Sequence, residues 1–517
     1  MSIHECIGYY TYRSFLDKPV GAPSDILWGE GELLLHISDE GGVSGTLAFP
    51  ATAAATTKSL MDLVGNVSSW SPLSFRFVGK GREGTDIKDF EYEYDCRVAY
   101  EWNAASPPQR LSLVGTVRRN KDHGNAKAGA TASFIAVKRD FVEPRDIDGV
   151  KLIPEAVAML SDRVHRLRHT VWHTLRNDWW SPKMIDADRI ELRKLGWGLD
   201  DPPRDQNGRI DLANGAGEDF LYMHRRMIKM VHDVYDKAGK PRPSIWKQIP
   251  GPALGQFVYV EKQDPTDPTK KSLQLDTENS GAMVPPPTKE FMAQVQGNSF
   301  FEFNKSPRGY SNLMQHIVSS LRSPRVLAQL TLGAYGNLIE FTVHNWMHMR
   351  WATISRNPVS LAPQVRTKYD VDSLWDDSKN DYLGDFHSSH VNPLFWKLHG
   401  WVDDCVDAWF AAHEVAHPGQ VKRATIRGID WFQQGAWVLK SDPFDWPQKE
   451  HDHGHGGHHQ TSTSELEDLL KVIALLKQVS ERTATTVVIG SKSSHSTLPG
   501  FAMHEDSGQL SDHGRTP

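Results

Sequence analysis

The chain has 517 residues, of which 39% are hydrophobic and 24% are charged, and its formal net charge is −6. This length allows two or three domains with sizeable cores. The mild acidity gives no reason to expect nucleic acid or an anionic membrane as a partner, and no run of about 18 apolar residues predicts a membrane-spanning helix.

The cysteines and the first residues bear on the compartment. Cys6, Cys96 and Cys405 are far apart and odd in number, which argues against a disulfide framework and favours a reducing compartment. The opening residues lack the basic and apolar regions of a signal peptide. We therefore expect a cytoplasmic protein, and a homo-oligomer stays open.

Residues 1–148 predict a β-rich domain. Short segments that alternate apolar and polar residues recur there, separated by turns rich in Gly, Asn and Pro. Alternation with period two is typical of strands with one buried face, so the pattern favours an antiparallel barrel or sandwich. The strands are expected within residues 31–38, 42–49, 73–79, 90–102, 110–118 and 132–141. A folding or oligomerisation module is the expected role.

Residues 149–440 predict a mainly helical domain, so the whole chain is expected to be an α+β multidomain protein. Helical patterns cover residues 154–179, 220–240, 311–323, 336–352 and 399–417. Residues 441–517 are expected to be a His-rich linker and a C-terminal extension with one helix over 464–482. A lid over the helical domain is the hypothesis for this extension.

His344 and His348 lie four residues apart in a predicted helix. Side chains at this spacing share one helical face, so both imidazoles can reach one metal ion. Such a pair alone is more often structural than metal-binding.

The segment LGDFHSSHVNPLFWKLHGWVDD (residues 383–404) follows this pair. This segment resembles the second copper half-site of the tyrosinase and catechol oxidase family of type-3 dicopper proteins. The resemblance lies in its Leu-Gly-Asp-Phe start, its Asn-Pro-x-Phe turn, His399 and Asp403. The resemblance implies that one copper, CuB, is bound by His344, His348 and His399. It also implies that Phe386 is an aromatic gate over that copper, and that Glu340 and Asn345 hold a water which deprotonates phenols.

The first copper half-site, CuA, resembles the family over residues 219–230 (DFLYMHRRMIKM), which gives His224 the role of its third ligand. Gly215 stands where the family usually has another ligand. His165, His169 and His173 are spaced by four along one predicted helix and offer the remaining ligands. We expect His169 and His173, with His165 as the alternative.

The resemblance implies a helical bundle around two copper ions. The implied function is ortho-hydroxylation of monophenols and oxidation of o-diphenols to o-quinones by molecular oxygen, on small phenolic substrates such as tyrosine or DOPA. Imidazole suits copper, and copper tops the affinity order at nitrogen sites. Alternatives are a catechol oxidase without monophenolase activity and a non-enzymatic O2-binding copper protein.

A zinc metalloprotease is the alternative from another class, because His413-Glu414-Val-Ala-His417 matches HExxH. Pro418 follows the second histidine directly, and no third ligand stands at the expected distance. We therefore expect these residues to form a surface helix face.

Overall fold

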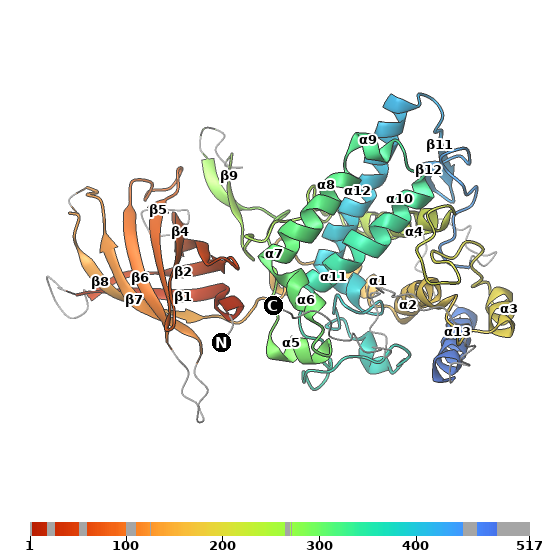
Figure 1. Cartoon of the computed structure of the whole chain (residues 1–517), viewed down its shortest axis with the longest axis horizontal. Helices are drawn as coiled ribbons and strands as arrows, with labels where there is room; N and C mark the ends of the chain where they lie inside the picture. The colour runs from red at the N-terminus through yellow and green to blue at the C-terminus, as the bar shows by residue number, and fades with distance from the viewer. Residues whose placement is uncertain are drawn as a thin grey trace, which may run out of the picture. The chain divides into compact units, whose positions relative to one another are not determined.

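The computed structural model describes residues 3–17, 26–50, 59–99, 110–124, 126–263, 269, 271–447 and 463–482. These residues form two compact units (Figure 1). The first unit comprises the described parts of Met1–Val150, Pro250–Lys289 and Ser299–Leu313, and the second those of Lys151–Ile249, Glu290–Asn298 and Met314–Pro517. The segments 250–289 and 299–313 thus belong to the first unit, whereas the sequence boundaries place them in the helical domain. No described helix has the length and hydropathy needed to cross a bilayer.

Eight antiparallel strands form a closed barrel in the first unit, so the fold is the barrel of the two predicted alternatives. The strands follow one another around the barrel in chain order, and the last pairs with the first, with Tyr12 opposite Ala136. Their bounds are β1 (Gly8–Leu16), β2 (Leu27–Ile37), β3 (Gly42–Phe49), β4 (Ser59–Trp70), β5 (Leu73–Gly81), β6 (Glu91–Ala99), β7 (Ser112–Arg119) and β8 (Thr131–Lys138).

The barrel interior is filled by side chains at alternate strand positions. Phe77 stacks on Tyr94 with ring centroids 5.0 Å apart, and Tyr12 lies 5.4 Å from Phe134. All four are buried. An eight-stranded barrel is narrow enough for such side chains to fill it, so this interior is a hydrophobic core.

Further short elements complete the first unit. They are η1 (Ile3–Cys6), η3 (Pro144–Asp146), the hairpin of β9 (Tyr259–Gln263) and β10 (Lys271–Leu275), α6 (Ser299–Lys305), α7 (Pro307–Gly309) and, except for its last residue, η4 (Tyr310–Met314). The backbone N–H of Phe257 donates to the Tyr9 hydroxyl oxygen at 3.0 Å, which joins the segment before β9 to the barrel.

The second unit is mainly helical, as predicted. Its longer helices are α2 (Arg163–Asp178), α4 (Ala216–Lys237), α12 (Pro393–Ala416) and α13 (Thr463–Glu481). The shorter elements are α1 (Pro154–Leu160), α3 (Asp186–Lys194), α5 (Lys289–Gln294), α8 (Gln315–Leu321), α9 (Pro324–Leu327), α10 (Leu332–Ile339), η5 (Glu340–His344), α11 (Asn345–Trp351), η6 (Ser373–Asp376), η7 (Ser389–Val391), β11 (Arg423–Ile426) and β12 (Ile429–Phe432).

Capping residues set where α2 and α12 begin. Asp162 accepts from the backbone N–H groups of Val164 and His165, which have no partner within the helix. Asn392 accepts from the N–H of Leu394 at 2.9 Å, and Pro393 occupies the first turn, where proline is tolerated. Asn392 is therefore the N-cap residue of α12.

Helices α4 and α10 cross at glycines. A methyl group on Gly217 would lie 2.0 Å from the carbonyl oxygen of Gly333, and one on Gly336 would lie 2.1 Å from that of Gly217. The two backbones are thus in direct contact, which larger side chains would prevent. This close crossing lies before the turn of α4 that carries His224 and before η5, which follows α10 and carries His344.

Helix α13 corresponds to the predicted C-terminal helix and packs against α2 and α3. Lys183 donates to the carbonyl oxygen of Ser480 at 2.9 Å, and Arg482 binds Asp188 at 2.8 Å. The His-rich run at 451–459 lies outside the described residues, so the lid stays a hypothesis.

Candidate metal centre

Six buried histidines converge inside the second unit. Helix α2 carries His169 and His173, α4 carries His224, and α12 carries His399. The continuous segment of α10, η5 and α11 carries the other two, His344 and His348. Each of the six side chains is at most 4% exposed.

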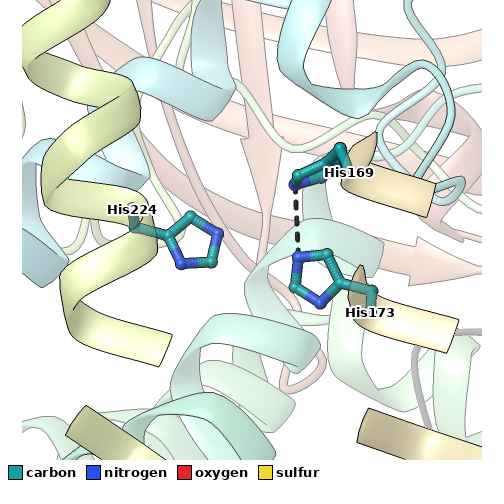
Figure 2. A group of neighbouring side chains, drawn as sticks. All are labelled: His169, His173 and His224. Carbon is teal, nitrogen blue, oxygen red and sulfur yellow. Dashed lines mark hydrogen bonds between the residues drawn. The ribbon is translucent and has the colours of Figure 1, made fainter. Parts of the chain in front are cut away.

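The first group consists of His169, His173 and His224, whose ligand nitrogens all lie within 4.8 Å of one another. Figure 2 shows His224 facing the two histidines of α2 across a common space. The Nε2 atoms of His169 and His173 are 3.2 Å apart. One metal ion between these nitrogens would have three imidazole ligands.

The second group consists of His224, His344 and His399, again within 4.8 Å. The Nε2 atoms of His344 and His399 are 2.9 Å apart, and His348 joins through its Nε2, 3.2 Å from that of His344. Because His224 belongs to both groups, the two candidate metal positions are adjacent. These groups are consistent with a binuclear site.

Hydrogen bonds at Nδ1 fix the ring orientations. Four of the rings donate from Nδ1–H to a backbone carbonyl oxygen. His169 donates to Phe386 at 2.6 Å and His348 to Leu383 at 3.0 Å. His224 donates to Phe220 at 2.8 Å and His399 to Phe395 at 2.7 Å. The Nδ1–H of His344 donates to Asn345 Oδ1 at 3.0 Å. With the hydrogen on Nδ1, each Nε2 presents a lone pair. Histidine ligands of metals are usually held this way.

This tautomer provides a test of whether a metal fits. The Nε2 atoms of His344 and His399 face each other at 2.9 Å, and neither carries a hydrogen to share. The Nε2 of His224 has no hydrogen-bond partner among the described residues. Two buried lone pairs that face each other repel, and a cation between them would satisfy both. The residues therefore fit metal ions.

Burial keeps these imidazoles neutral. It lowers the pKa of His169 to about 4 and that of His344 to about 3. Burial, followed by neighbouring histidines, also lowers the pKa of His173, His224 and His399 well below the usual value. A histidine binds metal only as the neutral ring, so the site is ready for a metal over a wide pH range.

A π-helical turn, η5, places His344. The N–H of Asn345 donates to the carbonyl oxygen of Glu340, five residues back, so one extra residue is accommodated in this turn. Such turns in otherwise α-helical segments are frequent at functional sites. No pattern in the sequence marks this turn.

Two ion pairs connect the helices that carry the histidines. Arg225 Nε binds Asp403 Oδ1 at 2.6 Å, joining α4 to α12. Arg176 Nε binds Glu340 Oε1 at 3.1 Å, joining α2 to η5. The sequence reasoning did not single out Arg176. Two features of the sequence could have identified it. Arg176 lies three residues after His173, and its charge is opposite to that of Glu340, which lies four residues before His344.

The other predicted site residues lie beside the histidines. The Phe386 ring stacks on His173, with centroids 4.5 Å apart and an angle of 11° between planes. It therefore contacts the first group, whereas the resemblance implies a position over the second metal. Glu340 and Asn345 are both buried, and each is bonded to a protein partner, Arg176 and His344 respectively.

His165, the alternative ligand, belongs to neither group of described residues that could hold a metal. Its ring lies 5.0 Å from that of His390, which in turn lies 4.8 Å from His169. His390 donates to the carbonyl oxygen of Leu160 at 3.0 Å. These two histidines form a buried layer behind the first group, and sequence reasoning did not identify His390.

The HExxH residues have a structural role. His413 Nε2 lies 3.1 Å from the carbonyl oxygen of Leu327, and His417 Nε2 lies 2.9 Å from that of Ala328. They thereby satisfy carbonyl groups at the end of α9. His413 is fully buried, so the expected surface face is wrong for this residue, while Glu414 is exposed.

No protein-family model matches the sequence, and a search of curated proteins finds no match. The assignment of the site therefore depends on its own residues. Two adjacent groups of three buried, neutral histidines, with ring nitrogens within 4.8 Å of one another, make a candidate binuclear metal centre.

Proposed function

We propose that this protein is a copper-dependent oxidase that uses molecular oxygen to oxidise small phenolic compounds such as tyrosine or DOPA. The observation that supports it best is the convergence of imidazole nitrogens in two adjacent groups. One copper would be held by His169, His173 and His224. The other would be held by His344, His348 and His399, with His224 close to both.

The donor set favours copper over other metals. Neutral imidazoles suit copper and zinc, and the order of affinity at nitrogen ligands peaks at Cu²⁺. No carboxylate or thiolate belongs to either group among the described residues. Two copper ions, when bound, would supply electrons to dioxygen two at a time, and the four electrons needed to form two waters come from two o-diphenols.

The reaction proposed is balanced with phenols as the only reductant. Two o-diphenols and one O2 give two o-quinones and two waters. One monophenol and one O2 give one o-quinone and one water. Hydrogen bonds at Nδ1 hold five of the six proposed ligand rings, and all six rings are buried. The resemblance of residues 383–404 to the family's second copper half-site supports this chemistry.

Metal content and oxygen uptake test the proposal together. We expect about two copper ions per chain, because two three-imidazole groups are present. Uptake of oxygen with catechol should consume one O2 for two catechols. A single zinc ion per chain with no oxidation would contradict the proposal. Two coppers without turnover of any phenol would instead indicate a protein that binds O2 without enzymatic activity.

Substitutions on one helix sharpen the test. His399→Ala should abolish turnover and lower the bound copper. His413→Ala, on the same helix but bonded to backbone carbonyls, should keep both. Full copper and activity in His399→Ala would contradict the ligand assignment. Loss of phenol oxidation in His413→Ala, with unchanged stability, would favour a role of the HExxH residues in the chemistry.

A further inference from the structure

The carboxylate of Glu340 is bound on both oxygens by one guanidinium. Arg176 Nε donates to Oε1 at 3.1 Å, and Arg176 Nη2 donates to Oε2. The Arg176 side chain is 1% exposed and that of Glu340 is 4% exposed. A bidentate pair of this kind is the most directional contact that arginine makes.

Arg176 is itself held in place. Its guanidinium lies 4.6 Å from the centre of the Trp172 ring, and Trp172 is buried. The free energy lost when a buried ion pair is broken exceeds the free energy gained from a hydrogen bond to water. Glu340 therefore does not exchange Arg176 for a water molecule.

Asn345 is also engaged. Its Oδ1 accepts from the Nδ1–H of His344 at 3.0 Å, and so it orients a candidate metal ligand. The family resemblance assigns Glu340 and Asn345 to holding a water. The side-chain oxygens of both residues are hydrogen-bonded to protein side chains instead. The carboxylate that the resemblance assigns to accepting the phenol proton is therefore held in a bidentate ion pair with Arg176.

We propose that Arg176 is a specificity-determining residue that directs this site to o-diphenols and against monophenols by holding Glu340. The inference rests on the proposed oxidase function. A monophenol must lose its single hydroxyl proton as its ring is hydroxylated, and a positioned acceptor speeds such a transfer. An o-diphenol needs no hydroxylation, and the four hydrogens removed from two of its molecules are those of the two waters formed.

The test uses a matched pair of substrates, 4-tert-butylphenol and 4-tert-butylcatechol, which differ by one hydroxyl. Wild-type protein should give a kcat/KM for the catechol at least about 100-fold above that for the phenol, the scale of a missing acid–base group. The variants are Arg176→Gln, which frees Glu340, Arg176→Lys, which cannot bind both oxygens, and the double variant Arg176→Gln with Glu340→Gln.

Arg225→Gln is the matched control, because it also breaks an ion pair between two helices that carry candidate ligands. Copper content and melting temperature are measured for every variant. Arg176→Gln should raise the phenol-to-catechol ratio about tenfold or more. Arg176→Lys should raise it less, and the double variant and the control should keep the wild-type ratio.

Three results separate the possibilities. An unchanged ratio in Arg176→Gln, with two coppers bound, overturns the inference. An equal rise in Arg225→Gln also overturns it, because loosening of the helices would then be the cause. If wild-type protein with two coppers oxidises neither substrate, the proposed function itself fails. Should Arg176→Gln not fold, the ratio in Arg176→Lys decides.

Discussion

Arg225 and Asp403 form an ion pair, with Nε and Oδ1 2.6 Å apart, that ties together the helices of His224 and His399. His224 directly precedes Arg225 on α4, and His399 lies one turn before Asp403 on α12. The centroids of the two imidazole rings lie 4.4 Å apart, with an angle of 28° between the ring planes. The ion pair therefore fixes the spacing of two candidate ligands from outside the metal site.

Replacing Asp403 by Ala should weaken both the fold and the candidate metal site. The Asp403 side chain is 26% exposed, so we expect a loss of about 2 kcal/mol in unfolding free energy, between the values for surface and buried pairs. Loss of such an outer contact should lower copper affinity about 10- to 100-fold. Urea unfolding of the apoprotein and competition with a copper chelator measure the two effects.

The exposed pair of Lys229 and Asp233 on α4 gives the control for Asp403→Ala. Both side chains are about half exposed, so Asp233→Ala should change stability by less than about 0.5 kcal/mol. It should leave copper affinity unchanged. Equal copper affinity in Asp403→Ala and wild type would show that the ion pair does not position the ligands.

His173→Ala should release one copper per chain, whereas His165→Ala should retain both. The nitrogens of His173 lie in the first group, while His165 faces His390 behind it. Elemental analysis after dialysis against a weak chelator gives the count. The opposite result, with copper lost only in His165→Ala, would move the first metal position one turn along α2.

The second group of histidines could be predicted from sequence better than the first. His344, His399 and their surroundings lie in recognisable motifs, so each was named individually. For the first group, three histidines spaced by four residues on α2 were all candidate metal ligands. Each step of four residues rotates about 40° around a helix, so His165 and His173 point in directions about 80° apart. The packing of α4 decides which of them face His224.

Contacts between distant segments were out of reach of sequence reasoning. Arg176 and Glu340 are 164 positions apart, and no local pattern pairs them. The same holds for the barrel, where alternation predicts strands but closure requires β1 to pair with β8. The stacking of Phe386 on His173 likewise depends on how the segment before α12 lies against α2.

Gly336→Ala should disrupt the crossing of α4 and α10. Its added methyl group would lie 2.1 Å from the carbonyl oxygen of Gly217, and backbone atoms cannot give way as side chains do. We expect a loss of about 3 kcal/mol or more in unfolding free energy, at the upper end of overpacking effects, together with reduced copper binding. Gly435→Ala, with no atom within 4 Å of the added methyl, is the control. Equal stability of the two variants would contradict this account of the crossing.

Glu218 should make stability depend on pH. This buried carboxylate accepts from the N–H groups of Leu439 and Lys440, at 2.6 and 2.9 Å, and so ties the segment after β12 to the start of α4. Burial raises its pKa from 4.5 to about 7. Between these values the folded chain keeps a proton that the unfolded chain has released. Its contribution to stability is therefore full below pH 4.5 and is lost as pH rises to 7.

The variant Glu218→Gln isolates this contribution, because glutamine does not titrate. Unfolding free energies of wild type and variant are measured in urea from pH 4.5 to 8. The unfolding free energy of wild type relative to the variant should fall as pH rises, by at most about 1.4 kcal/mol per pH unit, and should become constant above pH 7. The glutamine variant should be less stable at low pH, since its amide N–H2 faces a backbone N–H. A difference that stays constant across the range would mean that Glu218 ionises alike in both states, and that its two backbone hydrogen bonds offset its burial.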